Sequence, residues 1–120
     1  MKKIIFYFLV IISFTTISCT DYTDPKVLSG TTWRCSSFPD YLSDSYEYID
    51  LQFISTSQVD AWQKPKDGAL HKSETPESYI VSGKNITIGS GTEAITGTIE
   101  NKKMSLLFPS GQVTLIFTKQ

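Results

Sequence analysis

The chain has 120 residues, with 11 Lys and Arg against 12 Asp and Glu and one histidine. The first 18 residues are typical of a removable leader, and the 102 that remain are enough for one domain with one hydrophobic core. Without Lys2 and Lys3, nine basic side chains face twelve acidic ones, a net charge of −3. This balance, with no basic stripe in the sequence, argues against a nucleic-acid partner.

The leader predicts export and a lipid anchor. A basic head, Met1 to Lys3, precedes nine apolar residues from Ile4 to Ile12, too few for a membrane span of about 20 residues. The sequence Thr16-Ile17-Ser18-Cys19 resembles the lipobox of bacterial lipoproteins, although Thr16 stands where an aliphatic residue is usual. The resemblance implies that Cys19 is acylated, with palmitate among its chains, and holds the protein on a membrane. Cleavage nearby by an ordinary signal peptidase is the alternative.

Residues 19–29 predict a lipidated flexible stalk, because they contain Asp, Thr, Pro and Lys without an apolar period. Asp21 and Asp24 are similar to the acidic signal that sends some Gram-negative lipoproteins to the outer surface. We therefore expect a cell-envelope protein on the outer membrane, on its periplasmic or its exposed side. The domain proper is expected over residues 30–120.

From Thr31 onward, alternation of apolar and polar residues recurs between clusters of Gly, Ser, Asn and Pro, which predicts an all-β domain. The eight expected strands are Thr31 to Ser37, Tyr46 to Ser55, Gln58 to Gln63, Glu77 to Ser82, Asn85 to Ile88, Glu93 to Glu100, Lys103 to Phe108 and Gln112 to Thr118. Short turns between them favour an up-and-down meander. One apolar face per strand then favours a single antiparallel β-barrel of about eight strands, because closure leaves no exposed edge.

Several segments resemble the small lipocalin-like domains of Gram-negative bacterial lipoproteins. The resemblance is carried by Leu28-Ser29-Gly30-Thr31-Thr32-Trp33, by residues 78–88, by residues 95–99 with 104–106, and by residues 113–119. It implies a lipocalin-like barrel whose closed end is covered by Trp33, with a basic residue from the last strand, here Lys119, packed over it. The spacing from Gly30 to Trp33 is one residue longer than the Gly-x-Trp of the family.

The alternation also assigns candidate binding residues. Large inward side chains either fill the barrel or line a small pocket, and the candidate ligand-binding residues are Trp33, Phe53, Tyr79, Met104 and Phe108. Trp62 has the opposite parity to Val59 and Ala61, which predicts an outward position. The candidate partner surface comprises Trp62, Tyr48, Leu107 and Ile116.

Motifs for catalysis and metal binding are not found. Asp40, Asp44, Glu47 and Asp50 fit no cation loop and predict a solvated acidic stretch. Cys35 alternates with Arg34 and shares the face of Trp33, so we expect it to be buried rather than paired with His71 as a nucleophile. Residues 64–76 form the longest expected loop, a hairpin tip or a flap over the barrel.

The sequence therefore predicts a non-enzymatic, membrane-anchored barrel without cofactor or metal, which binds a small apolar or amphipathic ligand in its interior. The alternative is a filled barrel whose outer surface is recognised by another envelope protein, as a component or an inhibitor.

Overall fold

The computed structural model describes residues 21–120, so the leader and Cys19 lie outside the described residues. Two short α-helices, one 3-10 turn and nine strands make up this part of the chain. They are α2 (Pro25–Leu28), β1 (Thr32–Cys35), α3 (Asp40–Ser43), β2 (Tyr46–Phe53), β3 (Gln58–Pro65), β4 (His71–Lys72), β5 (Glu77–Ser82), β6 (Asn85–Ile88), η1 (Gly91–Glu93), β7 (Ile95–Glu100), β8 (Lys103–Phe108) and β9 (Val113–Lys119). Within residues 21–120, no helix has the length and apolar character needed to cross a membrane.

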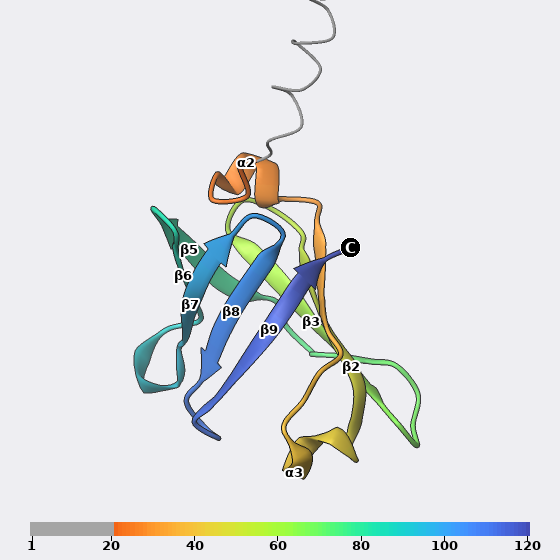
Figure 1. The fold of residues 1–120 in the computed structure, drawn as a ribbon. Coiled ribbons are helices and arrows are strands. Elements are labelled where there is room, and N and C mark those ends of the chain that lie inside the picture. The colour runs from red at the N-terminus through yellow and green to blue at the C-terminus, as the bar shows by residue number, and fades with distance from the viewer. Residues whose placement is uncertain (1–20) are drawn as a thin grey trace, which may run out of the picture.

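The strands form one closed antiparallel barrel, which confirms the predicted fold class (Figure 1). The sheet runs β2-β1-β9-β8-β7-β6-β5-β3, and a further pairing of β2 with β3 closes the ring. Short connections join β2 to β3, β5 to β6, β7 to β8 and β8 to β9, as a meander requires. Closure gives both β2 and β3 a partner on each side, so neither is left as an open edge.

The alternation of side chains along the strands gives the predicted inward and outward faces. The buried core is formed by Tyr22, Leu28, Trp33, Cys35, Leu51, Phe53, Val59, Tyr79, Ile86, Ile88, Ile99, Met104, Leu106, Leu115 and Phe117. In β8 and β9, Met104 opposes Phe117 and Leu106 opposes Leu115, so inward residues meet directly across the ladder. The barrel therefore encloses a hydrophobic core.

The expected long loop over residues 64–76 is wrong in its extent. β3 continues to Pro65, and β4 returns beside it with Gln63 opposite His71. Farther along, Val59 opposes Glu77 at the start of β5. β4 and β5 thus form one strand of the barrel, interrupted by residues 73–76. The sequence concealed this pairing because the returning strand is short and has no apolar alternation.

The segment expected to be a stalk instead packs on one end of the barrel, which we call the closed end. Tyr22 and Leu28 are buried, and Asp24 caps α2 by accepting a hydrogen bond of 3.0 Å from the Lys26 backbone N–H. Tyr22 meets the ring of Trp33 edge-on, with 5.3 Å between centroids. Residues 22 and 28 therefore pack on the barrel although they precede the boundary expected after Ser29.

The opposite end of the barrel, which we call the open end, carries α3 and the connections over residues 66–70, 89–94 and 109–112 (Figure 1). α3 was not expected from the sequence, because four residues are too few to show a helical period. Phe38, just before it, packs against the core and against Tyr46, with ring centroids 5.9 Å apart.

Candidate functional site

Four of the five predicted ligand-binding residues are part of the packed core. Trp33, Phe53 and Met104 are completely buried and Tyr79 is 4% exposed. The Trp33 indole N–H donates to Thr31 Oγ1 at 2.9 Å. Phe53 and Tyr79 pack edge to face with centroids 4.9 Å apart. The contacts of these residues stabilise the closed half of the barrel.

Tyr79 also joins two elements through its hydroxyl group. The Tyr79 O–H donates to the Ser55 carbonyl at 2.7 Å, which ties β5 to the turn after β2. Burial raises the pKa of the Tyr79 phenol, so the neutral donor form is favoured. This bond satisfies the polar tip of a side chain whose ring lies in the core.

The fifth predicted residue, Phe108, lines a small interior cavity. The cavity measures about 90 Å³, and its lining is formed by Ile49, Leu51, Val59, Asp60, Ala61, Gln63, Glu77, Ile88, Ile95 and Phe108. Most of these residues are apolar. The alternation of the strands pointed all of them inward except Asp60, which has the parity of the outward Trp62, but it carries no information on their height along the barrel axis. Height decides whether an inward residue packs in the closed half or lines the cavity.

The cavity lies where the ring of strands is weakest. β3 and β5 share only two register pairs, Gln58 with Ser78 and Val59 with Glu77, before residues 73–76 interrupt the ladder. Ser73 partly repairs the gap, because its N–H donates to the Ala61 carbonyl at 2.9 Å. Val59, Asp60 and Ala61, on the β3 side of this gap, all line the cavity.

Asp60 is the buried polar residue of this region. It is 7% exposed, and its Oδ2 lies 3.8 Å from Lys72 Nζ on β4. Its Oδ1 is buried and accepts no hydrogen bond from any residue in the described part of the chain. A buried carboxylate oxygen without a donor is energetically costly. Asp60 has the parity of Trp62, so its carboxylate lies on the outer face of β3, beside Lys72.

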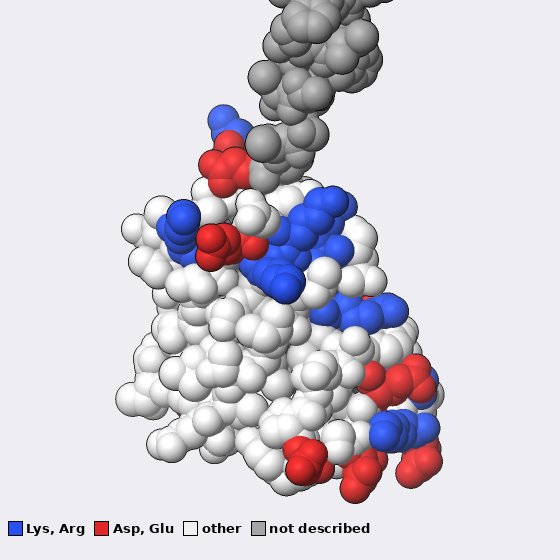
Figure 2. All heavy atoms as spheres, viewed as in Figure 1, with Lys and Arg blue, Asp and Glu red and all other residues white. Residues whose placement is uncertain are grey.

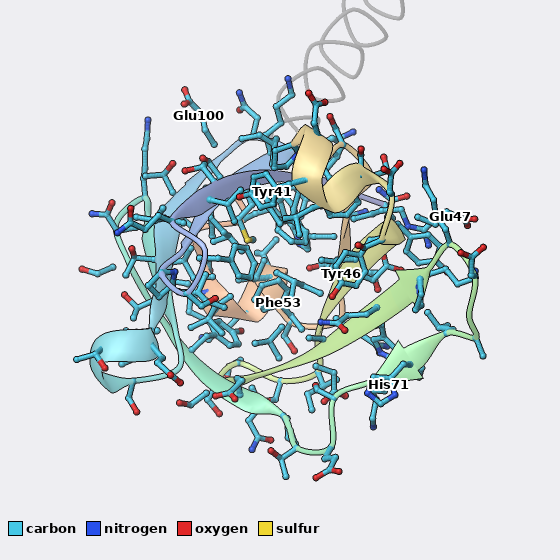
Figure 3. All side chains as sticks on the ribbon, turned by 90° about the horizontal axis from the view of Figure 1, so that it is seen from below. Tyr41, Tyr46, Glu47, Phe53, His71 and Glu100 are labelled. Carbon is cyan, nitrogen blue, oxygen red and sulfur yellow. The ribbon has the colours of Figure 1, made fainter. Side chains whose placement is uncertain are left out.

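The view into the open end shows how it is bordered (Figure 3). Phe53 lies deep within the ring of strands, Tyr41 and Tyr46 lie on the side of α3, and Glu47 and His71 lie outside the ring. Tyr41 is 64% exposed. The open end thus has an aromatic border on one side, close to the Phe38–Tyr46 pair.

The predicted partner surface is divided between two parts of the barrel. Leu107 and Ile116 are 44% and 47% exposed on β8 and β9, whereas Tyr48 and Trp62 lie on β2 and β3. β1 separates β9 from β2. Tyr48 is half-buried beneath Arg34, whose guanidinium lies 3.9 Å from the ring centroid. The four residues therefore do not form one patch.

Trp62 itself borders a shallow outer hollow of about 220 Å³, with Thr32, Asp50, Gln52 and Leu70 as the other lining residues. Its indole N–H donates to Gln52 Oε1 at 3.2 Å, and Lys72 Nζ lies 5.8 Å from the ring centroid. Trp62 is half-buried by these neighbours, and Leu70 beside it is 47% exposed.

The acidic residues between the first two strands are not gathered into a site. Asp50 binds Arg34 through both oxygens, at 2.8 and 2.9 Å, and this contact raises the pKa of the Arg34 guanidinium. Among residues 21–120, no group of three or more His, Cys, Asp or Glu side chains has the geometry to hold a metal ion.

Cys35 is buried, as the alternation predicted, and is a free thiol. Burial raises the pKa of this thiol, and its S–H donates to the Ser37 carbonyl at 3.4 Å. His71 is exposed on β4, which pairs with β3. The structure does not bring these two side chains together as a nucleophile and its base.

Comparison of the chain with protein-family models, with curated proteins and with solved structures finds no match. The functional interpretation therefore depends on the barrel, its cavity and the distribution of its side chains.

Proposed function

We propose that this protein is a lipid-anchored, non-enzymatic barrel of lipocalin-like type, which binds a small amphipathic molecule in the cavity beside the β3–β5 gap. The observation that carries the proposal is an apolar cavity whose lining also includes Gln63 and Glu77. An apolar group on the ligand fits the lining from Ile49, Ile95 and Phe108. A polar group on the same molecule lies toward Gln63 and Glu77.

The size of the cavity limits the ligand. At about 90 Å³ it is smaller than the roughly 150 Å³ of a cavity that holds benzene, and far below the roughly 300 Å³ at which pockets for drug-sized molecules begin. We therefore propose that only the apolar end of the ligand is enclosed, and that the rest extends through the β3–β5 gap or the open end. This differs from a ligand that occupies the whole barrel, since Trp33, Phe53 and Met104 fill the closed half.

Native mass spectrometry on protein extracted from its own membranes, without unfolding, tests the proposal. We expect an additional mass that is lost on denaturation, while the acyl mass on Cys19 persists because it is covalent. Ala61→Phe fills the cavity and should abolish the non-covalent mass. Ala69→Phe, at an exposed position of the connection between β3 and β4, is the matched control and should retain it.

A folded wild-type protein with no additional mass would contradict ligand binding. It would favour the alternative function, a filled barrel recognised through the hollow between Trp62 and Leu70. In that case Trp62→Ala should abolish capture of an envelope protein while the melting temperature stays within a few degrees. An intact mass without acyl chains would contradict the anchor independently of the ligand.

A further inference from the structure

The charged side chains are divided unequally between the two ends of the barrel. Five lysines lie at the closed end with three carboxylates: Lys26, Lys84, Lys102, Lys103 and Lys119 with Asp21, Asp24 and Glu100. The open half has the reverse balance, with Lys64, Lys66 and Lys72 against Asp40, Asp44, Glu47, Asp67, Glu74, Glu77 and Glu93. Figure 2 shows one face of this division, with blue side chains gathered below the grey N-terminal segment and red ones mainly at the opposite end.

Five lysines against three carboxylates give the closed end an excess of positive charge, and none of these lysines forms an ion pair within the described residues. The ion pairs among residues 21–120 are Arg34 with Asp50 and Lys72 with Asp60, and neither lies at this end. Two of the three carboxylates there are used locally. Asp21 accepts hydrogen bonds from the backbone and side chain of Thr23, and Asp24 caps α2. The ammonium groups of the closed end therefore form a surface that attracts anionic groups.

Two of these lysines border an open hollow of about 610 Å³ on the outside of β7, β8 and β9. Its lining is formed by Thr98, Glu100, Asn101, Lys102, Lys103, Ser105 and Ile116. Lys103 lies opposite Thr118 on β9, and the following Lys119 donates its backbone N–H to the Lys102 carbonyl at 2.9 Å. The ammonium, hydroxyl and amide groups here are donors suited to a phosphate, and Ile116 adds an exposed apolar wall.

The position of the anchor brings this end to the membrane. Cys19 precedes Asp21 by two residues, which span at most about 7 Å. Tyr22 is already buried at the closed end, so an acyl group on Cys19 would be three residues from a side chain packed on the barrel. A barrel anchored there has its lysines within reach of the lipid headgroups.

We propose that the closed end is a docking surface for anionic phospholipid headgroups, with a lipid phosphate held in the hollow by Lys102 and Lys103. The proposal rests on the acylation of Cys19 given above. It fixes the orientation of the molecule: the acidic open end points away from the bilayer, because like charges repel it from an anionic surface. The cavity then exchanges its ligand with the aqueous side rather than with the membrane.

Lysine acetylation, read by mass spectrometry, tests the docking surface on the full acylated protein. The protein is reconstituted in vesicles of phosphatidylcholine and in vesicles that also contain phosphatidylglycerol. We expect Lys84, Lys102, Lys103 and Lys119 to react severalfold more slowly in the anionic vesicles, and Lys66 to react equally in both. Salt at 1 M should remove the protection, because it shortens the screening length to about 3 Å.

A matched pair of variants distinguishes an effect of the closed-end surface from an effect of the net charge of the protein. Lys102→Glu and Lys66→Glu each reverse one exposed turn residue. Lys102→Glu should remove the protection of the remaining closed-end lysines, and Lys66→Glu should leave it intact. Equal acetylation in both vesicles, with the acyl mass present, would overturn the docking surface and leave the anchor and the ligand site standing. Absence of the acyl mass would overturn both the anchor and this inference.

Discussion

Gly97 shows how a single residue allows two neighbouring strands to approach closely. A Cβ at this position would lie 1.8 Å from the Ser105 carbonyl oxygen and 2.9 Å from Leu106 Cδ2. Gly97 opposes Leu106 in the ladder between β7 and β8, so this close approach lies inside a regular strand pair. A glycine in a strand interior is otherwise unfavourable, and here it permits two strands to approach closely.

Gly97→Ala should therefore destabilise the protein by about 3 kcal/mol or more, because the backbone of β8 has to move. Urea unfolding measures the effect. Gly111→Ala is the control: its Cβ would meet only Val113 Cγ1, at 3.7 Å, and we expect a change within about 0.5 kcal/mol. Similar midpoints for the two variants would show that β8 accommodates the Cβ at Gly97 without cost.

At the scale of the elements, the sequence predicted what alternation encodes and missed what depends on contacts distant in the chain. β5, β6 and β8 have the predicted bounds, because turn residues bound each of them closely and apolar residues recur at every second position. α2 was missed, because its four residues show no period and become a structural element only by packing Leu28 against the barrel. The cavity could not be placed from the sequence, because alternation gives the face of a residue but not its height in the barrel.

A pair of substitutions in α2 tests whether this helix belongs to the barrel. Leu28 is completely buried and Val27, its neighbour, is 37% exposed. We expect Leu28→Ala to lower the free energy of unfolding by about 2–5 kcal/mol, and Val27→Ala to change it by less than about 1 kcal/mol. Thermal and urea unfolding provide the measurement. Equal small effects would restore the interpretation of residues 21–29 as a free stalk.

At the scale of the whole molecule, the barrel is closed by ladders of very different length. β7 and β8 share five register pairs and β8 and β9 share six, whereas β3 and β5 share two and β1 and β9 share two. The β1–β9 ladder is reinforced at the closed end, where Trp33 is buried opposite Lys119 and Tyr22 covers it. The β3–β5 ladder has no comparable cover and borders the cavity.

Opening of the barrel should therefore begin between β3 and β5. Native-state hydrogen exchange should show faster exchange, through local opening, for amides of residues 73–79 than for those of residues 97–107, which lie in the long ladders. In residues 73–79, the Tyr79 N–H donates a hydrogen bond to the Ser57 carbonyl at 3.0 Å, and the Ser73 N–H donates one to the Ala61 carbonyl. If ligand exchange uses this gap, loss of the ligand should raise exchange in residues 73–79 and leave residues 97–107 unchanged. Uniform protection around the barrel would mean that it opens only by global unfolding, and the ligand would then have to enter through the open end.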